Sequence, residues 1–202
     1  MTASTQNVQI GPGRLYVAPV GESNPDETTV AYGSAWGGNW VDLGDFVEGS
    51  GSRVRINEDY VDVYTEQMTA PVTAVRKRRE ASIMATLIEM SATTMAYLLD
   101  GTAATTAAGG AQKGYYEVPF GTNSDVDFYK WGLETLAQDA SGNNQPIRWF
   151  FHIGYLMSSA EIANGKAAPS GLAVEIKCLG DSSQSAGEEL GIFQHVTAAA
   201  TS

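Results

Sequence analysis

The sequence contains few of the side chains on which most enzyme chemistry depends. Its 202 residues include one cysteine, Cys178, and two histidines, His152 and His195. A lone cysteine excludes an internal disulfide bond and a thiolate metal site, so we expect Cys178 to be a small core residue. His152 lies in the apolar stretch WFFHIGY and His195 has no acidic neighbour in the sequence, so neither has the setting of a general base. We therefore expect no enzymatic activity, no cofactor and no metal ion.

Positive charge is the second shortage. The chain carries 12 lysine and arginine residues against 23 aspartate and glutamate residues, a formal net charge of -11. An acidic protein of this kind lacks the basic footprint of a nucleic-acid reader. It can still lie near nucleic acid without binding to it.

Long apolar runs are the third shortage. No stretch approaches the roughly 20 apolar residues that a membrane helix needs. The opening residues MTASTQNVQIGPG have neither the basic region nor the apolar core of a signal peptide. We expect a soluble protein that does not insert into membranes and that stays in the cytoplasm where it is made.

Glycines and strand patterns are what the sequence has in quantity. Its 22 glycines are spread along the chain, which is typical of many turns between short strands. In GLAVEIKCL the even-numbered residues 172–178 would face inward and Glu175 and Lys177 outward. The segments with strand patterns are 13–20, two short strands on either side of Gly44-Asp45, a third opening at Arg53, then 56–67, 80–90, 114–120, 127–136, 147–157, 171–180 and 191–196.

Two of these segments decide how the middle of the chain is interpreted. In INEDYVDVYTEQ, Tyr60, Asp62 and Tyr64 fall on one face and Val61 and Val63 on the other, which predicts a half-buried strand. The next apolar stretch, EASIMATLIEM, has no polar stripe at helical spacing. We therefore predict a second strand there rather than a helix.

One segment, about residues 91–100, favours an α-helix. Ser91 is a good N-cap, apolar residues follow at helical spacing, and Gly101 suits the position after the C-terminus. The predicted fold is mainly β: an antiparallel β-sandwich or barrel with one flanking α-helix, in a single domain over residues 1–202. We expect a flexible N-terminal segment (1–12) and long loops near 66–79 and 102–114.

A glycine-rich loop gathers three aromatic residues, Tyr32, Trp36 and Trp40. Such side chains could stack on a sugar, contact another subunit or hold the loop in place. Aromatic residues are enriched at protein interfaces, and no sugar-binding motif lies beside them, which favours an interface or a local anchor. A carbohydrate-binding β-sandwich, as in a receptor-binding or decoration module, is the alternative function.

Four segments, taken in order, carry a resemblance to a known family. They are GPGRLYVAPVGE, WVDLGDFVEGSGSRVRINEDYVDVYTEQ, REASIMATLIEMSATTMAYLLDG and the ending GLAVEIKCLGD…GIFQHV. Together they cover most of the chain, and their order and spacing resemble the tail tube (major tail) proteins of bacteriophages with long, non-contractile tails.

The resemblance implies a β-sandwich with a helix on its flank and a structural role in the virion tail. Six copies would form a ring whose inner sheets join into a closed barrel, and rings would stack into a tube through which DNA passes into the host. The partners implied are further copies of the chain, the tape measure protein, and tail completion or tail tip proteins. Assembly would take place in the host cytoplasm.

A conduit for DNA should not bind phosphates, because each cation paired with a phosphate adds affinity. An acidic wall would meet that need. The candidates to line the lumen are outward positions of the long predicted strands: Asp59, Asp62, Glu66, Ser82, Thr86, Glu175 and Lys177.

A third of the positive charge is gathered at Arg76, Lys77, Arg78 and Arg79, which fall in the predicted loop 66–79. A charge run usually faces water. In the resembled family the corresponding connection reaches toward the adjacent ring. The functional alternative is therefore a basic surface that contacts an acidic surface of another copy, where opposite potentials fix orientation and register. DNA binding is disfavoured, because it conflicts with the purpose of a conduit.

Overall fold

The computed structural model describes residues 13–26, 30–121, 125–138, 142–157, 161–163 and 171–197. The predicted class is confirmed: the described chain is mainly β, with antiparallel pairing throughout, one α-helix and no closed barrel. The expected flexible segment 1–12 lies outside the described residues. The elements are β1 (Arg14–Pro19), β2 (Val41–Asp45), β3 (Ser52–Val63), β4 (Thr73–Leu87), α1 (Ala92–Leu98), β5 (Ala104–Thr106), β6 (Tyr115–Glu117), β7 (Tyr129–Gln138), β8 (Asn144–Leu156), β9 (Glu161–Ala163), β10 (Gly171–Leu179) and β11 (Gly191–His195).

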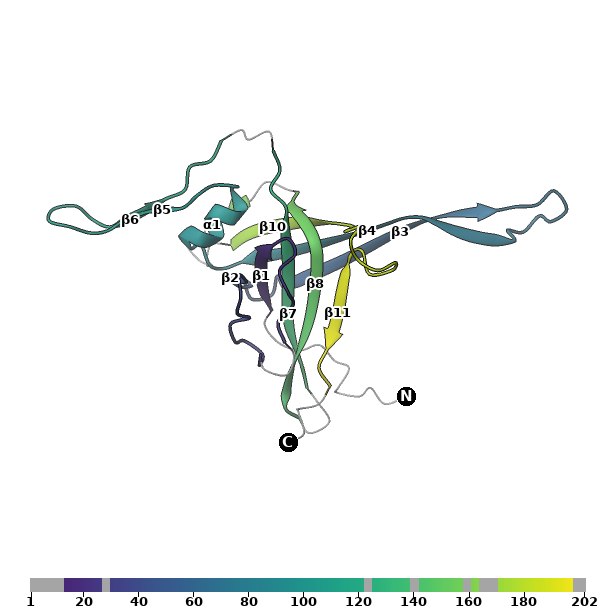
Figure 1. Cartoon of the computed structure of the whole chain (residues 1–202), viewed down its shortest axis with the longest axis horizontal. Helices are drawn as coiled ribbons and strands as arrows, with labels where there is room; N and C mark the ends of the chain where they lie inside the picture. The colour runs from purple at the N-terminus through teal and green to yellow at the C-terminus, as the bar shows by residue number, and fades with distance from the viewer. Residues whose placement is uncertain are drawn as a thin grey trace.

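Nine of the strands form one strongly bent sheet (Figure 1). Its order is β2-β1-β7-β8-β10-β4-β3, with β11 added to β8 and β9 to β10. One edge of β8 is shared: residues 147–151 pair with β11 and residues 153–156 pair with β10. The sheet therefore divides at β8 into two leaves that bend around a common core.

Alternating side chains of β4 and β10 form one wall of that core, as predicted. The buried residues are Ala81, Ile83, Ala85, Leu87, Leu172, Val174, Ile176 and Cys178. Leu15 and Val17 of β1 and Leu98 of α1 close the core from the other leaf and from the flank. Core burial is what makes the leaves stable, because the apolar surface removed from water contributes about 25 cal/mol for each Å².

The helix begins as predicted and ends earlier. The backbone N–H of Thr94 donates to the Ser91 hydroxyl at 3.0 Å, which caps the first turn. Beyond the C-terminal end of the helix, Asp100 adopts the left-handed conformation (φ 49°) that was expected of Gly101. Gly101 is needed for a different reason: a Cβ there would lie 2.5 Å from the Pro119 carbonyl oxygen.

A single strand replaces the two short strands expected on either side of Gly44-Asp45. β2 runs through Gly44, whose φ of 107° few other residues adopt, and ends at Asp45. Phe46 then forms an isolated bridge with Leu87, which holds the end of β2 against β4. Gly44 therefore does not break the strand, because it accommodates the irregular backbone conformation within β2.

The largest departure from expectation is an arm formed by residues 57–80, in which β3 and β4 continue far beyond the sheet (Figure 1). The four basic residues 76–79, which we call the basic run, therefore lie in a strand. β4 begins at Thr73, so that only residues 64–72 connect the two strands. The expected half-burial is also wrong, because Val61 on one face and Tyr60 on the other are 49% and 54% exposed. In the arm, β3 and β4 pair with each other, but no other described part of the same chain covers either face. The sequence therefore alternates as in a strand, although the side chains stay exposed.

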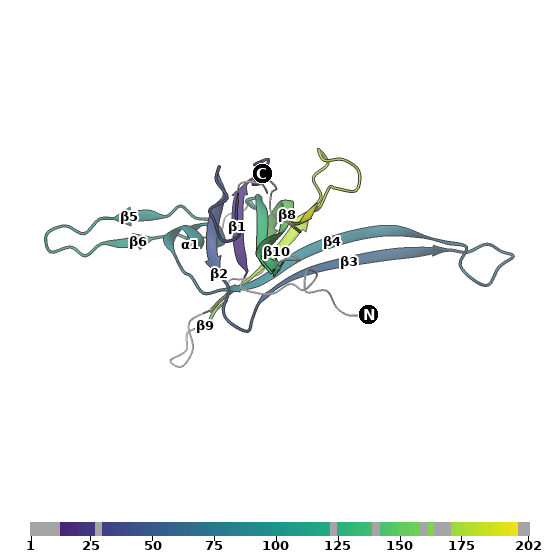
Figure 2. The ribbon, with the colours of Figure 1, turned by 90° about the horizontal axis from the view of Figure 1, so that it is seen from below.

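A second hairpin projects on the opposite side of the molecule (Figure 2). It consists of β5, β6 and the segment between them, which corresponds to the predicted loop 102–114. A bridge between Gly109 and Gln112 closes its tip, so part of the expected loop is a two-stranded hairpin. Among the described residues, no helix has the length and apolar character needed to span a bilayer.

Strand β11 packs so closely on β8 that its first residue must be glycine. A Cβ on Gly191 would lie 2.1 Å from the Phe150 carbonyl oxygen, a backbone atom that cannot move aside alone. We expect Gly191→Ala to destabilise the protein by about 1–3 kcal/mol, because β11 must shift away from β8. Urea unfolding followed by tryptophan fluorescence measures this free energy.

Gly180 provides the matched control for this substitution. The nearest atom to a Cβ there is the Glu189 Cβ at 3.8 Å, an ordinary contact. Gly180→Ala should leave the free energy of unfolding within about 0.5 kcal/mol of wild type. Equal effects of the two substitutions would show that the close approach of β11 to β8 is not what requires glycine.

Burial also determines how the single thiol behaves. Cys178 is 3% exposed, and burial raises the pKa of its thiol to about 12. The thiolate is the reactive form, so we expect no labelling by a maleimide in the folded protein at mildly alkaline pH and full labelling in urea. Mass spectrometry counts the adducts, and rapid labelling of the folded chain would contradict the buried position.

Candidate assembly surfaces

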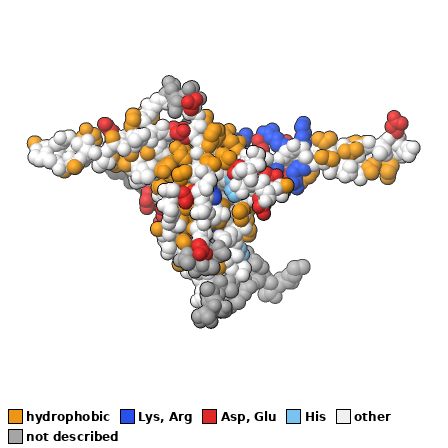
Figure 3. Space-filling view, viewed as in Figure 1, with side chains coloured by type: hydrophobic (Ala, Val, Ile, Leu, Met, Phe, Trp, Pro, Cys, Tyr) orange, Lys and Arg blue, Asp and Glu red, His pale blue; other side chains and the backbone are white. Residues whose placement is uncertain are grey.

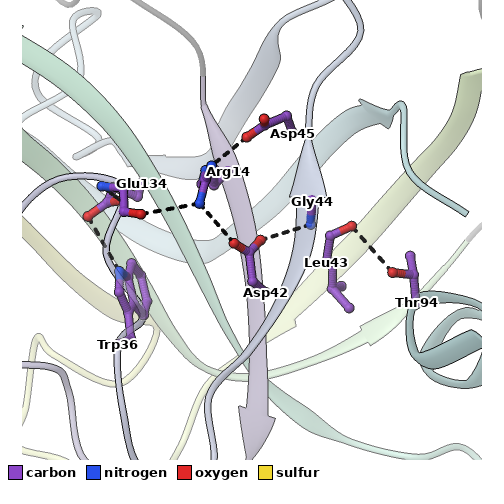
Figure 4. Close-up of polar contacts among 9 residues, drawn as sticks. Arg14, Trp36, Asp42, Leu43, Gly44, Asp45, Thr94 and Glu134 are labelled. Atoms are coloured by element: carbon purple, nitrogen blue, oxygen red, sulfur yellow. Dashed lines mark hydrogen bonds and ion pairs between the residues drawn. The ribbon is translucent and has the colours of Figure 1, made fainter. Parts of the chain in front are cut away.

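The loop that carries the aromatic residues is fixed to the sheet by a buried ion pair that sequence reasoning missed. Glu134 of β7 and Arg148 of β8 are cross-strand neighbours with fully buried side chains, and Arg148 Nε lies 3.0 Å from Glu134 Oε1. Gly33 N donates to Glu134 Oε2 at 3.0 Å. Trp36 Nε1 donates to Glu134 Oε1 at 3.4 Å (Figure 4). A charged residue inside each of two apolar strands was the available signal, since charges are rarely buried without a partner.

The same loop leaves no exposed tryptophan pair for a sugar. Trp36 is buried and stacks on Tyr16, with ring centroids 3.9 Å apart. Trp40 packs edge-on against Trp36 at 4.9 Å, and its Nε1 donates to the Ser23 carbonyl oxygen. Tyr32 is half-buried, and burial raises the pKa of its hydroxyl. These contacts support the local-anchor interpretation and remove the main support for carbohydrate binding.

The basic run lies at the base of the arm, where it meets acidic side chains of both strands (Figure 3). Register places Arg79 opposite Glu58 and Arg76 opposite Tyr60, so Lys77 is the extra residue of a bulge. The bulge brings both arginines to the Glu58 side: Arg79 forms an ion pair with Glu58, and Arg76 Nε lies 3.5 Å from Glu58 Oε2. Hydrogen bonds from Tyr60 and Arg79 lower the pKa of the Glu58 carboxyl.

Arg78, by contrast, points to the other face of the arm. Arg78 forms an ion pair with Glu80, and Lys177 Nζ of β10 lies 3.2 Å from the same carboxylate. Hydrogen bonds from Arg78 and then Lys177 lower the pKa of Glu80. Glu58 thus pairs with Arg76 and Arg79, and Glu80 pairs with Arg78 and Lys177, so cations outnumber the carboxylates that pair with them at the base of the arm.

Five of the seven candidate lumen residues share one surface, which we call the outer face: the side of β3, β4 and β10 that is turned away from the core. Lys177 pairs directly with Ser82, and Thr86 lies four residue pairs further along β4, opposite Ala173. The candidates on this face are Asp59, Ser82, Thr86, Glu175 and Lys177.

The other two candidates lie elsewhere. Asp62 is an even-numbered residue of β3 and belongs to the opposite face, with Glu58 and Tyr60. Glu66 lies in the connection at the end of the arm, outside any strand. In a regular strand, residues three apart always face opposite ways, so Asp59 and Asp62 cannot line one wall together.

The outer face carries charges of both signs. Its cationic side chains are Arg53, Arg55, Arg78 and Lys177, and its anionic ones are Asp59, Glu80 and Glu175. The expected acidic wall is therefore not formed by this face of a single chain. Within the part of the chain that the structure describes, no cluster of three or more His, Cys, Asp or Glu could hold a metal ion.

Comparison with known proteins identifies the family. No individual curated protein matches the sequence. The family model for phage tail tube proteins matches residues 1–187, which include both projecting hairpins and the core strands up to β10. The match extends over far more than half of the chain and agrees with the antiparallel β fold and its flanking helix. The chain belongs to the phage tail tube protein family, whose members are structural components of the virion tail.

Proposed function

We propose that the chain assembles into rings of six copies, and that the rings stack into a tail tube through which the genome passes into the host. The observation that carries this proposal is the arm. Both of its faces expose apolar side chains: Tyr60, Val61, Val63, Val75 and, at its end, Tyr64, Met68 and Val72. So many exposed large apolar side chains on one projecting hairpin favour protein association.

Unpaired strand edges support the same proposal. Among the described strands, β2, β3 and β11 each form a ladder with one neighbour, so each has a second edge without a partner strand. Such edges invite pairing with other chains unless they are covered. Pairing between neighbouring copies would close the sheets into a ring and leave no free edge.

The outer face is our candidate for the wall of the bore, now without Asp62 and Glu66. Its mixed charges would give DNA phosphates little net attraction, which suits passage without specific binding. The base of the arm, with Arg76, Lys77, Arg78 and Arg79, would instead contact an acidic surface of another copy. Tape measure protein and tail completion or tip proteins would be further partners, and assembly would precede release from the host cytoplasm.

Thiol accessibility tests the proposed wall. In a Cys178→Ala background, Ser82→Cys should react with a polymer-bearing maleimide as free subunits and become protected in long tubes. Val20→Cys is the control, because Val20 is 44% exposed and directly follows β1, outside the strands β3, β4 and β10 that form the outer face. Undiminished labelling of Ser82→Cys in intact tubes would place the bore elsewhere.

Electron microscopy of the purified protein, with sedimentation at increasing concentration, tests the function itself. We expect rings or tubes with a uniform bore, formed without other proteins. A chain that stays monomeric at all concentrations, or that forms small oligomers and binds immobilised glycans, would favour a receptor-binding or decoration module instead.

A further inference from the structure

An apolar groove lies where the arm leaves the sheet, and we call it the arm-base groove. It has a volume of about 440 Å³ and lies between the core-side face of β3 and β4 and the strands β8 and β11. The side chains that define it are Ile56, Arg76, Arg79, Trp149, Ile192 and Phe193.

The floor of the arm-base groove is open and aromatic. Phe193 is 52% exposed and packs against Trp149, with ring centroids 4.6 Å apart. Ile56 on the opposite side is 50% exposed. Large apolar side chains that face each other across an open groove favour an apolar occupant, because they would lose contact with water when it binds.

Positive charge along one rim of the groove restricts which occupant can bind there. Arg76 and Arg79 line the side formed by the arm and share the single carboxylate of Glu58. Glu189 lines the other side, where its carboxylate accepts a hydrogen bond from Gly187 N at 2.8 Å. The arm side of the groove therefore suits an occupant with an acidic group beside its apolar residues.

The end of the arm has these properties. Residues 64–72, which we call the arm tip, expose Tyr64, Met68 and Val72 and carry one charged residue, Glu66. Hydrogen bonds from Val72 N to Val63 O at 2.8 Å and from Met68 N to Thr65 O at 3.2 Å shape the tip as a turn. Figure 3 shows acidic side chains at this end and basic ones at the base.

We propose that the arm-base groove binds the arm tip of a second copy of the chain. The tip cannot reach the groove of its own chain, because it lies at the far end of the paired strands (Figure 1): the eight residue steps from Ile56 to Tyr64 span about 26 Å of extended backbone. Met68 and Val72 would lie on Phe193 and Ile56, and Glu66 would face Arg76. Tip and groove are different surfaces, so the contact is heterologous and repeats from copy to copy. The inference rests on the proposed self-assembly and names the surface that receives the arm.

Disulfide trapping tests this contact. In a Cys178→Ala background, one variant carries Met68→Cys and another carries Phe193→Cys, and the two are mixed during assembly and then oxidised. We expect covalent dimers on non-reducing denaturing gels only in the mixture, and a ladder of oligomers when one chain carries both cysteines. Met68→Cys paired with Val20→Cys is the control and should give no more than background cross-linking.

The outcomes separate the contact from the tube. Tubes that form without cross-linking above the Val20 control overturn the inference and leave the proposed function standing. Cross-linked oligomers without tubes support the contact and overturn the tube. Absence of both overturns both proposals.

Charge reversal gives an independent test. Glu66→Arg would place a cation against the positive rim, and we expect the critical concentration for assembly to rise about tenfold, equivalent to ~1.4 kcal/mol. Glu48→Arg makes the same charge change at an exposed turn away from the arm and should leave the critical concentration unchanged. Equal effects of the two variants would overturn the proposed contact.

Discussion

A variant in which Asn-Gly replaces residues 59–78 should fold and fail to assemble. Every residue removed is exposed, and the buried side chains of β4 begin only after the arm, at Ala81. Removing the arm therefore leaves both core walls intact, while it deletes the apolar faces, the arm tip and most of the basic run. We expect loss of all polymer in electron microscopy and sedimentation.

The folded state of the shortened chain is the control for this result. Its melting temperature should lie within about 4 °C of the wild-type value, which corresponds to a loss of ~1 kcal/mol. Circular dichroism measures it. Tubes formed by the shortened chain would contradict an assembly role for the arm, and an unfolded chain would contradict the independence of the core from it.

The second large effect concerns stability rather than assembly. Arg148→Met should lower the free energy of unfolding by about 3–5 kcal/mol, because it leaves the Glu134 carboxylate buried without a countercharge. It also removes the bond from Arg148 Nη2 to the Val30 carbonyl oxygen, which is 2.6 Å long. Urea unfolding measures the change.

Two matched variants show whether burial is the cause. Combining Arg148→Met with Glu134→Leu removes both charges, and we expect it to recover most of the lost stability. Arg14→Met breaks the ion pairs of Arg14 with Asp42 and Asp45, but this arginine side chain is 32% exposed, so the loss should stay within about 1 kcal/mol. Similar losses for Arg14→Met and Arg148→Met would contradict the account.

The core could be predicted from sequence because its strands are covered on a known side. In β10, alternation identified Leu172 and Ile176 as inward residues, and both are fully buried. Helix α1 was recognisable from Ser91, whose capping hydrogen bond depends only on local geometry. Both signals are local, and neither requires knowledge of what surrounds the chain.

The arm could not be predicted in the same way. Alternation at Tyr60 and Val61 indicates a strand, but it does not say which face is covered or whether the cover belongs to the same chain. Residues 73–79 show no apolar period, and Pro71 precedes them, so a loop was the natural expectation. Pairing with β3 supplies the order that the local sequence does not.

The candidate sites also differ in whether local sequence patterns could indicate them. The grouping of Ser82, Glu175 and Lys177 followed from alternation in two strands that share the core. The arm-base groove joins residues of β3, β4, β8 and β11, which only the folded chain brings together. No local pattern in the sequence could have indicated it.

A cryo-electron microscopy reconstruction of tubes assembled from the purified chain tests the central claim most directly. We expect the part of the arm beyond the Asp59–Arg78 pair, residues 60–77, to lie against neighbouring copies along both of its faces, with Glu66 of one copy at Arg76 of the next. Tubes in which the arms extend into solvent, or a preparation without ordered polymer, would contradict the account.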